Sequence, residues 1–181
     1  MSYTLRFDPG KIAVLAARYI SQNTDQAAEE RIMTEIGPTA RRNGFYSRAE
    51  FLELCHWKTP RTQPRCAEND ELSVRDVTAL ALGTGNERLR IEALTLLSGV
   101  GWPTASVLLH FGHTNPYPIL DFRALYSLGE EVPSEYDFRF WWEYVQVCRD
   151  IADKHSIDMR TLDRALWQYS AENQPKAVSI C

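Results

Sequence analysis

Apolar side chains recur every three or four residues along most of this chain, the spacing that places them on one face of an α-helix. Near the N-terminus, for example, Ile12, Leu15 and Tyr19 follow this spacing. No segment shows the alternation of apolar and polar residues that indicates a strand. The pattern therefore predicts an all-α fold, with helices over 9–20, 27–36, 48–57, 73–82, 86–97, 103–109, 122–128, 134–152 and 159–169.

Polar and helix-breaking residues predict where several of these helices begin and end. Gly37-Pro38 is expected to end the second helix, because proline lacks the N–H that a helix interior needs. Ser47-x-x-Glu50 has the spacing of a capping box, in which two side chains bind the free backbone N–H groups at a helix start. Ser73 is expected to open the next helix in the same way.

The most informative segment, residues 94–112, joins two predicted helices through a glycine turn. Ser98-Gly99-Val100-Gly101 can form this turn because glycine adopts positive φ at little cost. Pro103 then falls in the first turn of the second helix, where no N–H is needed. Backbone N–H groups at the start of that helix would form a small anion site, which suits a nucleic-acid phosphate.

This segment resembles the helix-hairpin-helix superfamily of DNA glycosylases, whose members carry the motif Leu-Pro-Gly-Val-Gly-x-x-Thr-Ala and a catalytic Asp at a fixed distance beyond it. The variable position before Thr-Ala is Pro103 here, and Thr104-Ala105 follows it. Asp121 lies 18 residues after Pro103, as the family pattern requires. The close match covers residues 92–129. The resemblance implies a fold of two small helical lobes with a cleft between them.

The resemblance also implies roles for individual residues, with double-stranded DNA as the partner. Asp121 would be the catalytic carboxylate, although its place before a helix also makes it an ordinary capping residue. The backbone N–H groups expected to hold a DNA phosphate lie near Gly99, Gly101 and Thr104. The carbonyls at positions where family members hold a monovalent cation, Na⁺ or K⁺, are those of Thr95, Leu97 and Val100.

Departures from the family pattern limit the chemistry that is expected. Bifunctional members carry Lys at the position of Pro103, so the resemblance implies a glycosylase that forms no Schiff base and has no AP-lyase activity. Many members bind an iron–sulfur cluster through four cysteines, whereas only Cys148 and Cys181 follow Asp121. We therefore expect no iron–sulfur cluster and no other cofactor. Arg123 replaces a family His and could still reach a phosphate.

A second candidate region is the loop over 56–65, which contains no acidic residue. It combines an aromatic side chain with cations, a composition that suits stacked bases and phosphates. Trp57 and Trp102 are expected to line the base pocket or to wedge into the duplex. The alternative for Trp57 is a place in the core, with the loop as a surface turn. The residues expected to contact the DNA backbone are Lys58, Arg61 and Arg65.

Composition sets bounds on this interpretation. The chain has 181 residues, is 44% hydrophobic and carries a net charge of −4, which is unusual for a DNA-binding protein. Basic residues are concentrated between 38 and 65, a range that contains six Lys and Arg and only two Glu. No apolar run is long enough to span a membrane and no signal peptide is evident, so a cytoplasmic location is expected. The irregularly spaced cysteines are typical of buried free thiols.

The sequence predicts one compact helical unit over 1–181. Within it we expect a reduced helical lobe over about 40–92, a hairpin-containing lobe formed by 1–39 with 93–172, and a loose tail over 173–181. Besides a glycosylase, two other functions fit: a non-catalytic helix-hairpin-helix DNA-binding module and a protein-interaction domain. The sequence does not indicate an oligomeric state.

Overall fold

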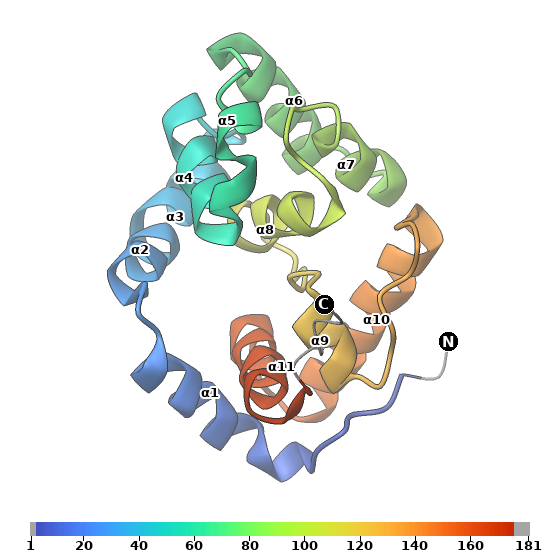
Figure 1. Cartoon of the computed structure of the whole chain (residues 1–181). Helices are drawn as coiled ribbons and strands as arrows, with labels where there is room; N and C mark the ends of the chain where they lie inside the picture. The colour runs from blue at the N-terminus through green and yellow to red at the C-terminus, as the bar shows by residue number, and fades with distance from the viewer. Residues whose placement is uncertain (1–2, 176–181) are drawn as a thin grey trace, which may run out of the picture.

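The computed structural model describes residues 3–175, and all regular structure in that range is helical, which confirms the all-α prediction. The α-helices are α1 (Ile12–Gln22), α2 (Gln26–Arg31), α3 (Gly37–Asn43), α4 (Arg48–Lys58), α5 (Gln63–Cys66), α6 (Glu71–Gly83), α7 (Glu87–Leu94), α8 (Trp102–Gly112), α9 (Phe122–Ser127), α10 (Phe138–Lys154) and α11 (Met159–Asn173). Three short helical segments join them: η1 (Pro9–Lys11), η2 (Ile32–Ile36) and η3 (Pro60–Thr62). Figure 1 shows the course of the chain.

The helices form two groups. In the first, α11 packs along α1 and also contacts α9 and α10. In the second, the largely buried helix α8 contacts α3, α4 and α7, and α6 packs on α7. Figure 1 shows the first group below the second, with the segments 23–25 and 113–121 passing between them. Helix α8 also contacts η2 and α6, so the helices it packs against come from residues 32–94. The expected division into two lobes stays a prediction.

The predicted glycine turn precedes α8. Gly99 has φ +79°, and a Cβ at this position would lie 2.7 Å from the Sγ of Cys66, so only glycine fits this close approach without strain. Asn69 fixes the turn from the side, since its amide group accepts from the N–H of Ser98 and donates to the Ser98 carbonyl. The helix before the turn ends at Leu94, three residues earlier than predicted.

The second predicted helix does not end at Gly37-Pro38, and that prediction is wrong. The backbone widens into the π-helical segment η2, in which the N–H of Gly37 donates to the carbonyl of Ile32. Pro38 then occupies the first turn of α3, where its missing N–H costs little. Gly37 serves a close contact, because a Cβ there would lie 2.7 Å from the Phe111 carbonyl of α8.

Capping side chains account for the starts of several other helices. Ser47 and Glu50 form the predicted capping box of α4. The predictions for two later helices are wrong by a few residues, since Asp70 rather than Ser73 caps α6, and Asp137 caps α10. An Asp side chain in the cap position accepts backbone N–H groups as well as Ser does, so the sequence offered two equivalent starts.

The described residues contain no helix long and apolar enough to cross a membrane. Cys55, Cys66 and Cys148 are buried free thiols, as predicted. Of the expected tail, Asn173 is still the last residue of α11, and 176–181 lie outside the described residues.

Candidate functional site

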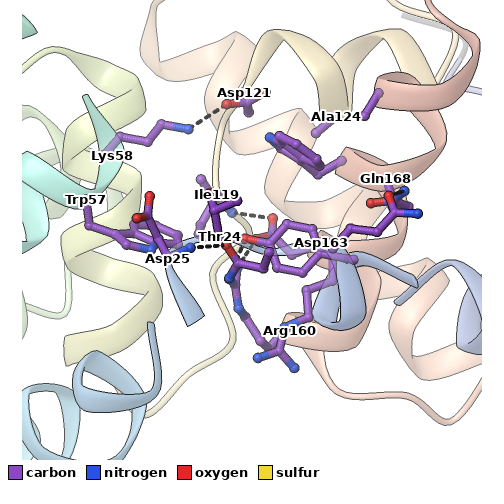
Figure 2. A pocket seen from close by; sticks show the side chains of 16 residues that line it. Thr24, Asp25, Trp57, Lys58, Ile119, Asp121, Ala124, Arg160, Asp163 and Gln168 are labelled. Atoms are coloured by element: carbon purple, nitrogen blue, oxygen red, sulfur yellow. Dashed lines mark hydrogen bonds and ion pairs between the residues drawn. The ribbon is translucent and has the colours of Figure 1, made fainter. Parts of the chain in front are cut away.

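A cavity of about 430 Å³ lies between the two helix groups. Its walls come from α1 and the segment after it, from the end of α4, from the segment before α9, and from α11. Figure 2 shows the side chains that line it. Its volume is within the range of about 300–1,000 Å³ that is usual for small-molecule sites. Two sets of charged side chains contribute to its lining: the Lys58–Asp121 pair and a buried network on α11.

Asp121 is at the mouth of this cavity. It caps α9, where its Oδ1 accepts the N–H of Arg123 at 2.8 Å. Its Oδ2 accepts from the Nζ of Lys58 at 2.7 Å. The side chain of Asp121 is 18% exposed, so it reaches the cavity and is not sealed among packed helices. Asp121 is therefore both a helix cap and a side chain that lines the cavity.

Lys58, one of the expected DNA contacts, lines the cavity. Its ammonium points toward Asp121 (Figure 2). Lys58 is the last residue of α4, and its side chain is only 12% exposed. The two partners are 63 residues apart in the sequence, so only the packing of α4 against the segment before α9 brings them together.

The buried network consists of Glu29, Arg160, Asp163 and Arg164, and all of these except Glu29 line the cavity. Glu29 of α2 is 3% exposed and pairs with two arginines of α11, Arg160 at 2.9 Å and Arg164. Arg160 also donates to Asp163 at 2.7 Å, and Asp163 accepts the backbone N–H of Ile119 at 3.2 Å. Two carboxylates and two guanidinium groups, with side chains 4–16% exposed, therefore share several hydrogen bonds.

The network shifts the pKa values of its members. Burial raises the pKa of Asp163 to about 6, and the nearby charges of Arg160 and Lys58 only partly oppose this. Burial acts on Glu29 in the same direction, but the charges and hydrogen bonds of its two arginines outweigh it and lower its pKa. Burial also lowers the pKa of His110 to about 3, with a further contribution from the charge of Arg160. His110 is therefore neutral near pH 7, and its Nδ1 lies 2.6 Å from the Tyr117 carbonyl.

Aromatic side chains give the cavity apolar surfaces. Trp57 lines it, as predicted for a pocket wall, and packs edge-on against Phe111 beneath the guanidinium of Arg160. Tyr19 and Trp167 also line the cavity and contact each other edge to face at 5.3 Å between ring centres. Trp102 is not part of the cavity: it packs against Trp141 instead. The structure thus brings only the first of the two predicted tryptophans to the site.

The other predicted DNA contacts lie outside the cavity. Arg61 and Arg65 are exposed, and neither forms an ion pair within residues 3–175. Arg123 stacks over Trp167, with its guanidinium carbon 4.8 Å from the ring centre. Arg48 is engaged elsewhere, because it donates to the carbonyls of two residues that follow α5. The free cations near the site are therefore fewer than the sequence suggested.

The hairpin residues also lie apart from the cavity lining. Gly101 is exposed and precedes α8, whereas the side chain of Thr104 is buried. Among the proposed cation ligands, the Leu97 carbonyl accepts the N–H of Val100 at 3.1 Å, which leaves one lone pair on that oxygen. A monovalent cation here stays a prediction. No cluster of His, Cys, Asp and Glu suited to a metal ion occurs in the part of the chain that the structure describes.

Sequence reasoning missed the charged face of α11. Arg160, Asp163, Arg164 and Trp167 follow one another at spacings of three or four residues, so they share a helix face. That spacing was available as a signal, but a charged helix face usually faces solvent. Only the presence of Glu29 on another helix makes burial of this face favourable.

Comparison of the chain with models of protein families, with curated proteins and with solved structures gives no match. The chemistry of the site therefore rests on its geometry. An amine and a carboxylate in contact, with aromatic surfaces beside them, can bind a flat ring, stabilise a developing positive charge and move a proton.

Proposed function

We propose that this protein is a DNA N-glycosylase, which extrudes a damaged or modified base from duplex DNA and hydrolyses its N-glycosidic bond. The observation that carries the proposal is the position of Asp121, whose carboxylate reaches a cavity large enough for a base and lined by Trp57 and Trp167. Enzymes that act on a base within a duplex take the base out of the stack and hold it in such a pocket.

In this proposal the fold is a reduced version of the helix-hairpin-helix glycosylase fold. The N–H groups around Gly99 and Gly101 at the start of α8 hold a phosphate of the DNA backbone, because the positive end of the helix dipole points there. The exposed cations Arg61 and Arg65 add contacts to neighbouring phosphates. Contacts of both kinds position the duplex and do not read its sequence.

The extruded base would enter the cavity between Trp57 and Trp167, with its sugar beside Asp121 at the mouth. As the bond between base and sugar breaks, positive charge grows on the deoxyribose ring. The Asp121 carboxylate stabilises that charge and orients the attacking water, as carboxylates do in the hydrolysis of related glycosidic bonds.

The test is base release from duplexes that each carry one of several damaged or modified bases. Asp121→Asn keeps the size of the side chain and its capping oxygen but removes the charge. We expect base release to fall by about 10²–10³-fold, the usual cost of losing one group that stabilises a transition-state charge. Asp76→Asn is the matched control, since Asp76 is exposed on α6 and does not line the cavity. The proposal is contradicted if no duplex releases a base, or if wild type and Asp121→Asn release it equally.

A second function is favoured by one observation: both oxygens of Asp121 already accept hydrogen bonds, one of them from Lys58. A non-catalytic DNA-binding module could retain such a pair as a structural contact. It would bind duplex DNA in a salt-dependent way, weaken on Arg61→Ala, and release no base from any substrate.

A further inference from the structure

The contact between Lys58 and Asp121 places a primary amine at the position where the proposed glycosylase would hold a sugar. The Nζ of Lys58 lies 2.7 Å from Oδ2 of Asp121, and both side chains line the same cavity. A carbon atom that is close enough for the carboxylate to stabilise is therefore also within reach of the amine. The other lysines that the structure describes, Lys11 and Lys154, are exposed and do not line the cavity.

We propose that Lys58 is a nucleophile that forms a Schiff base with the abasic deoxyribose and leads to cleavage of the DNA strand. This inference rests on the proposed function, because the abasic site is the product of base release. It replaces the expectation of a glycosylase without lyase activity. That expectation considered only the hairpin, where Pro103 offers no amine. The structure places an amine at the same cavity from α4.

The surroundings of Lys58 suit a nucleophilic amine. Its side chain is mostly buried against the cavity, and the carboxylate next to it can accept the proton that the ammonium must lose before it attacks. The backbone of Lys58 is held at the end of α4, where the N–H of the next residue, Thr59, donates to the Cys55 carbonyl. A lysine held in place in this way avoids much of the entropic cost of bringing two reactants together.

The reaction balances without an oxidant or reductant. The abasic sugar is in equilibrium with its open-chain aldehyde, and the lone pair of Nζ forms a bond to C1′ while the carbonyl oxygen takes up a proton. Loss of one water gives the protonated imine. Asp121 then removes a proton from C2′, the C2′–C3′ double bond forms, and the C3′–O bond breaks with the 3′-phosphate as leaving group. A second water hydrolyses the imine and releases the free amine and an unsaturated aldehyde.

The test uses a duplex with one preformed abasic site, so no lesion needs to be known. Wild-type protein is incubated with this duplex and sodium borohydride, which reduces an imine to a stable amine link. We expect a covalent protein–DNA complex and, without borohydride, a strand cut on the 3′ side of the site. Peptide mapping of the complex should place the link on the peptide that contains Lys58.

Lys58→Arg is the decisive variant, because guanidinium keeps the charge beside Asp121 but does not form the imine. We expect it to lose the covalent complex and the strand cut, while Lys154→Arg retains both. Thermal unfolding and abasic-duplex binding of each variant, measured in parallel, separate loss of chemistry from loss of fold. A complex that persists in Lys58→Arg, or a link that maps to another amine, overturns the inference.

The outcomes also separate this inference from the proposed function. If wild type releases a base and binds the abasic duplex but forms no covalent complex, the Lys58 inference is wrong and the glycosylase proposal stands. If it neither releases a base nor binds the abasic duplex, both are wrong. A covalent complex without base release from any lesion tested would support Lys58 as a nucleophile in a protein that acts on existing abasic sites.

Discussion

Two groups of charged side chains line the same cavity and differ in how they are held. The Lys58–Asp121 pair has one salt bridge, and its members are 12% and 18% exposed. The buried network joins Glu29 to Arg160 and Arg164, and Arg160 to Asp163, through side chains that are 4–16% exposed. A network in which each charge has several partners cannot release one without leaving others unpaired. The Lys58–Asp121 pair has a single salt bridge to release, and it is the part of the cavity lining that carries the proposed chemistry.

The largest expected effect is the loss of unfolding free energy when one charge of the buried network is removed. Arg160→Ala would leave Asp163 buried with only the Ile119 N–H as partner and would remove one of the two arginines of Glu29. Removing one partner of a buried ion pair costs about 3–5 kcal/mol. We expect the free energy of unfolding, measured in urea, to fall by that amount. Arg18→Ala is the control, because the Arg18–Glu172 pair is far more exposed and should contribute no more than about 1 kcal/mol.

Equal destabilisation by Arg160→Ala and Arg18→Ala would contradict the structural role of the buried network. It would mean that water reaches the network and screens it as it screens a surface pair. A smaller loss in Arg160→Ala at acidic pH than at neutral pH would sharpen the comparison, since Asp163 would then be protonated and would no longer need a cation.

The next largest expected effect is the change of unfolding free energy with pH, to which His110 and Asp163 contribute. The pKa of His110 is lowered to about 3 in the folded protein. Below pH 6.5 the unfolded chain therefore binds a proton that the folded chain rejects, so His110 removes stability as pH falls. Asp163 acts in the opposite sense, because its folded pKa is raised to about 6 and protonation stabilises the folded state as pH falls below 6.

We expect these two contributions to oppose each other in the wild type between pH 7 and pH 5. His110→Asn retains an N–H for the Tyr117 carbonyl but does not titrate. The variant should therefore gain about 1–2 kcal/mol at pH 5 relative to pH 7, compared with the same difference in the wild type. The measurement is urea unfolding at both pH values, and Asp163→Asn should change the difference in the opposite direction. An unchanged difference in His110→Asn would show that His110 does not titrate as a buried group.

The local structure of the hairpin and of the start of α9 could be predicted from the sequence, because its signals are local. The cap position of Asp121, the glycine turn at Gly99 and the start of α8 at Pro103 each depend on a few neighbouring residues. The helix over 27–36 shows the limit of such signals. Gly37 ends a helix by local rules, yet here it permits a close approach to α8, which only the tertiary fold requires.

The charged contacts of the site could not be predicted in this way. Lys58 meets Asp121 across 63 residues, and Glu29 meets Arg164 across 135. A helix face rich in charge is equally consistent with solvent and with a buried network, because spacing reports which residues share a face and not what covers it. Whether such a face is buried depends on the helix that packs against it, and the sequence does not identify that helix.

The smallest expected effect is the stability cost of removing Lys58. Lys58→Met keeps the length and apolar stem of the side chain but ends its ion pair with Asp121. The freed oxygen of Asp121 faces the cavity, where water can take the place of the ammonium, and the other oxygen retains the Arg123 N–H. We therefore expect the loss in unfolding free energy to stay below the loss of about 3–5 kcal/mol expected for Arg160→Ala. A loss of several kcal/mol would make the pair as structural as the network, and the functional assignment of this pair would lose its physical basis.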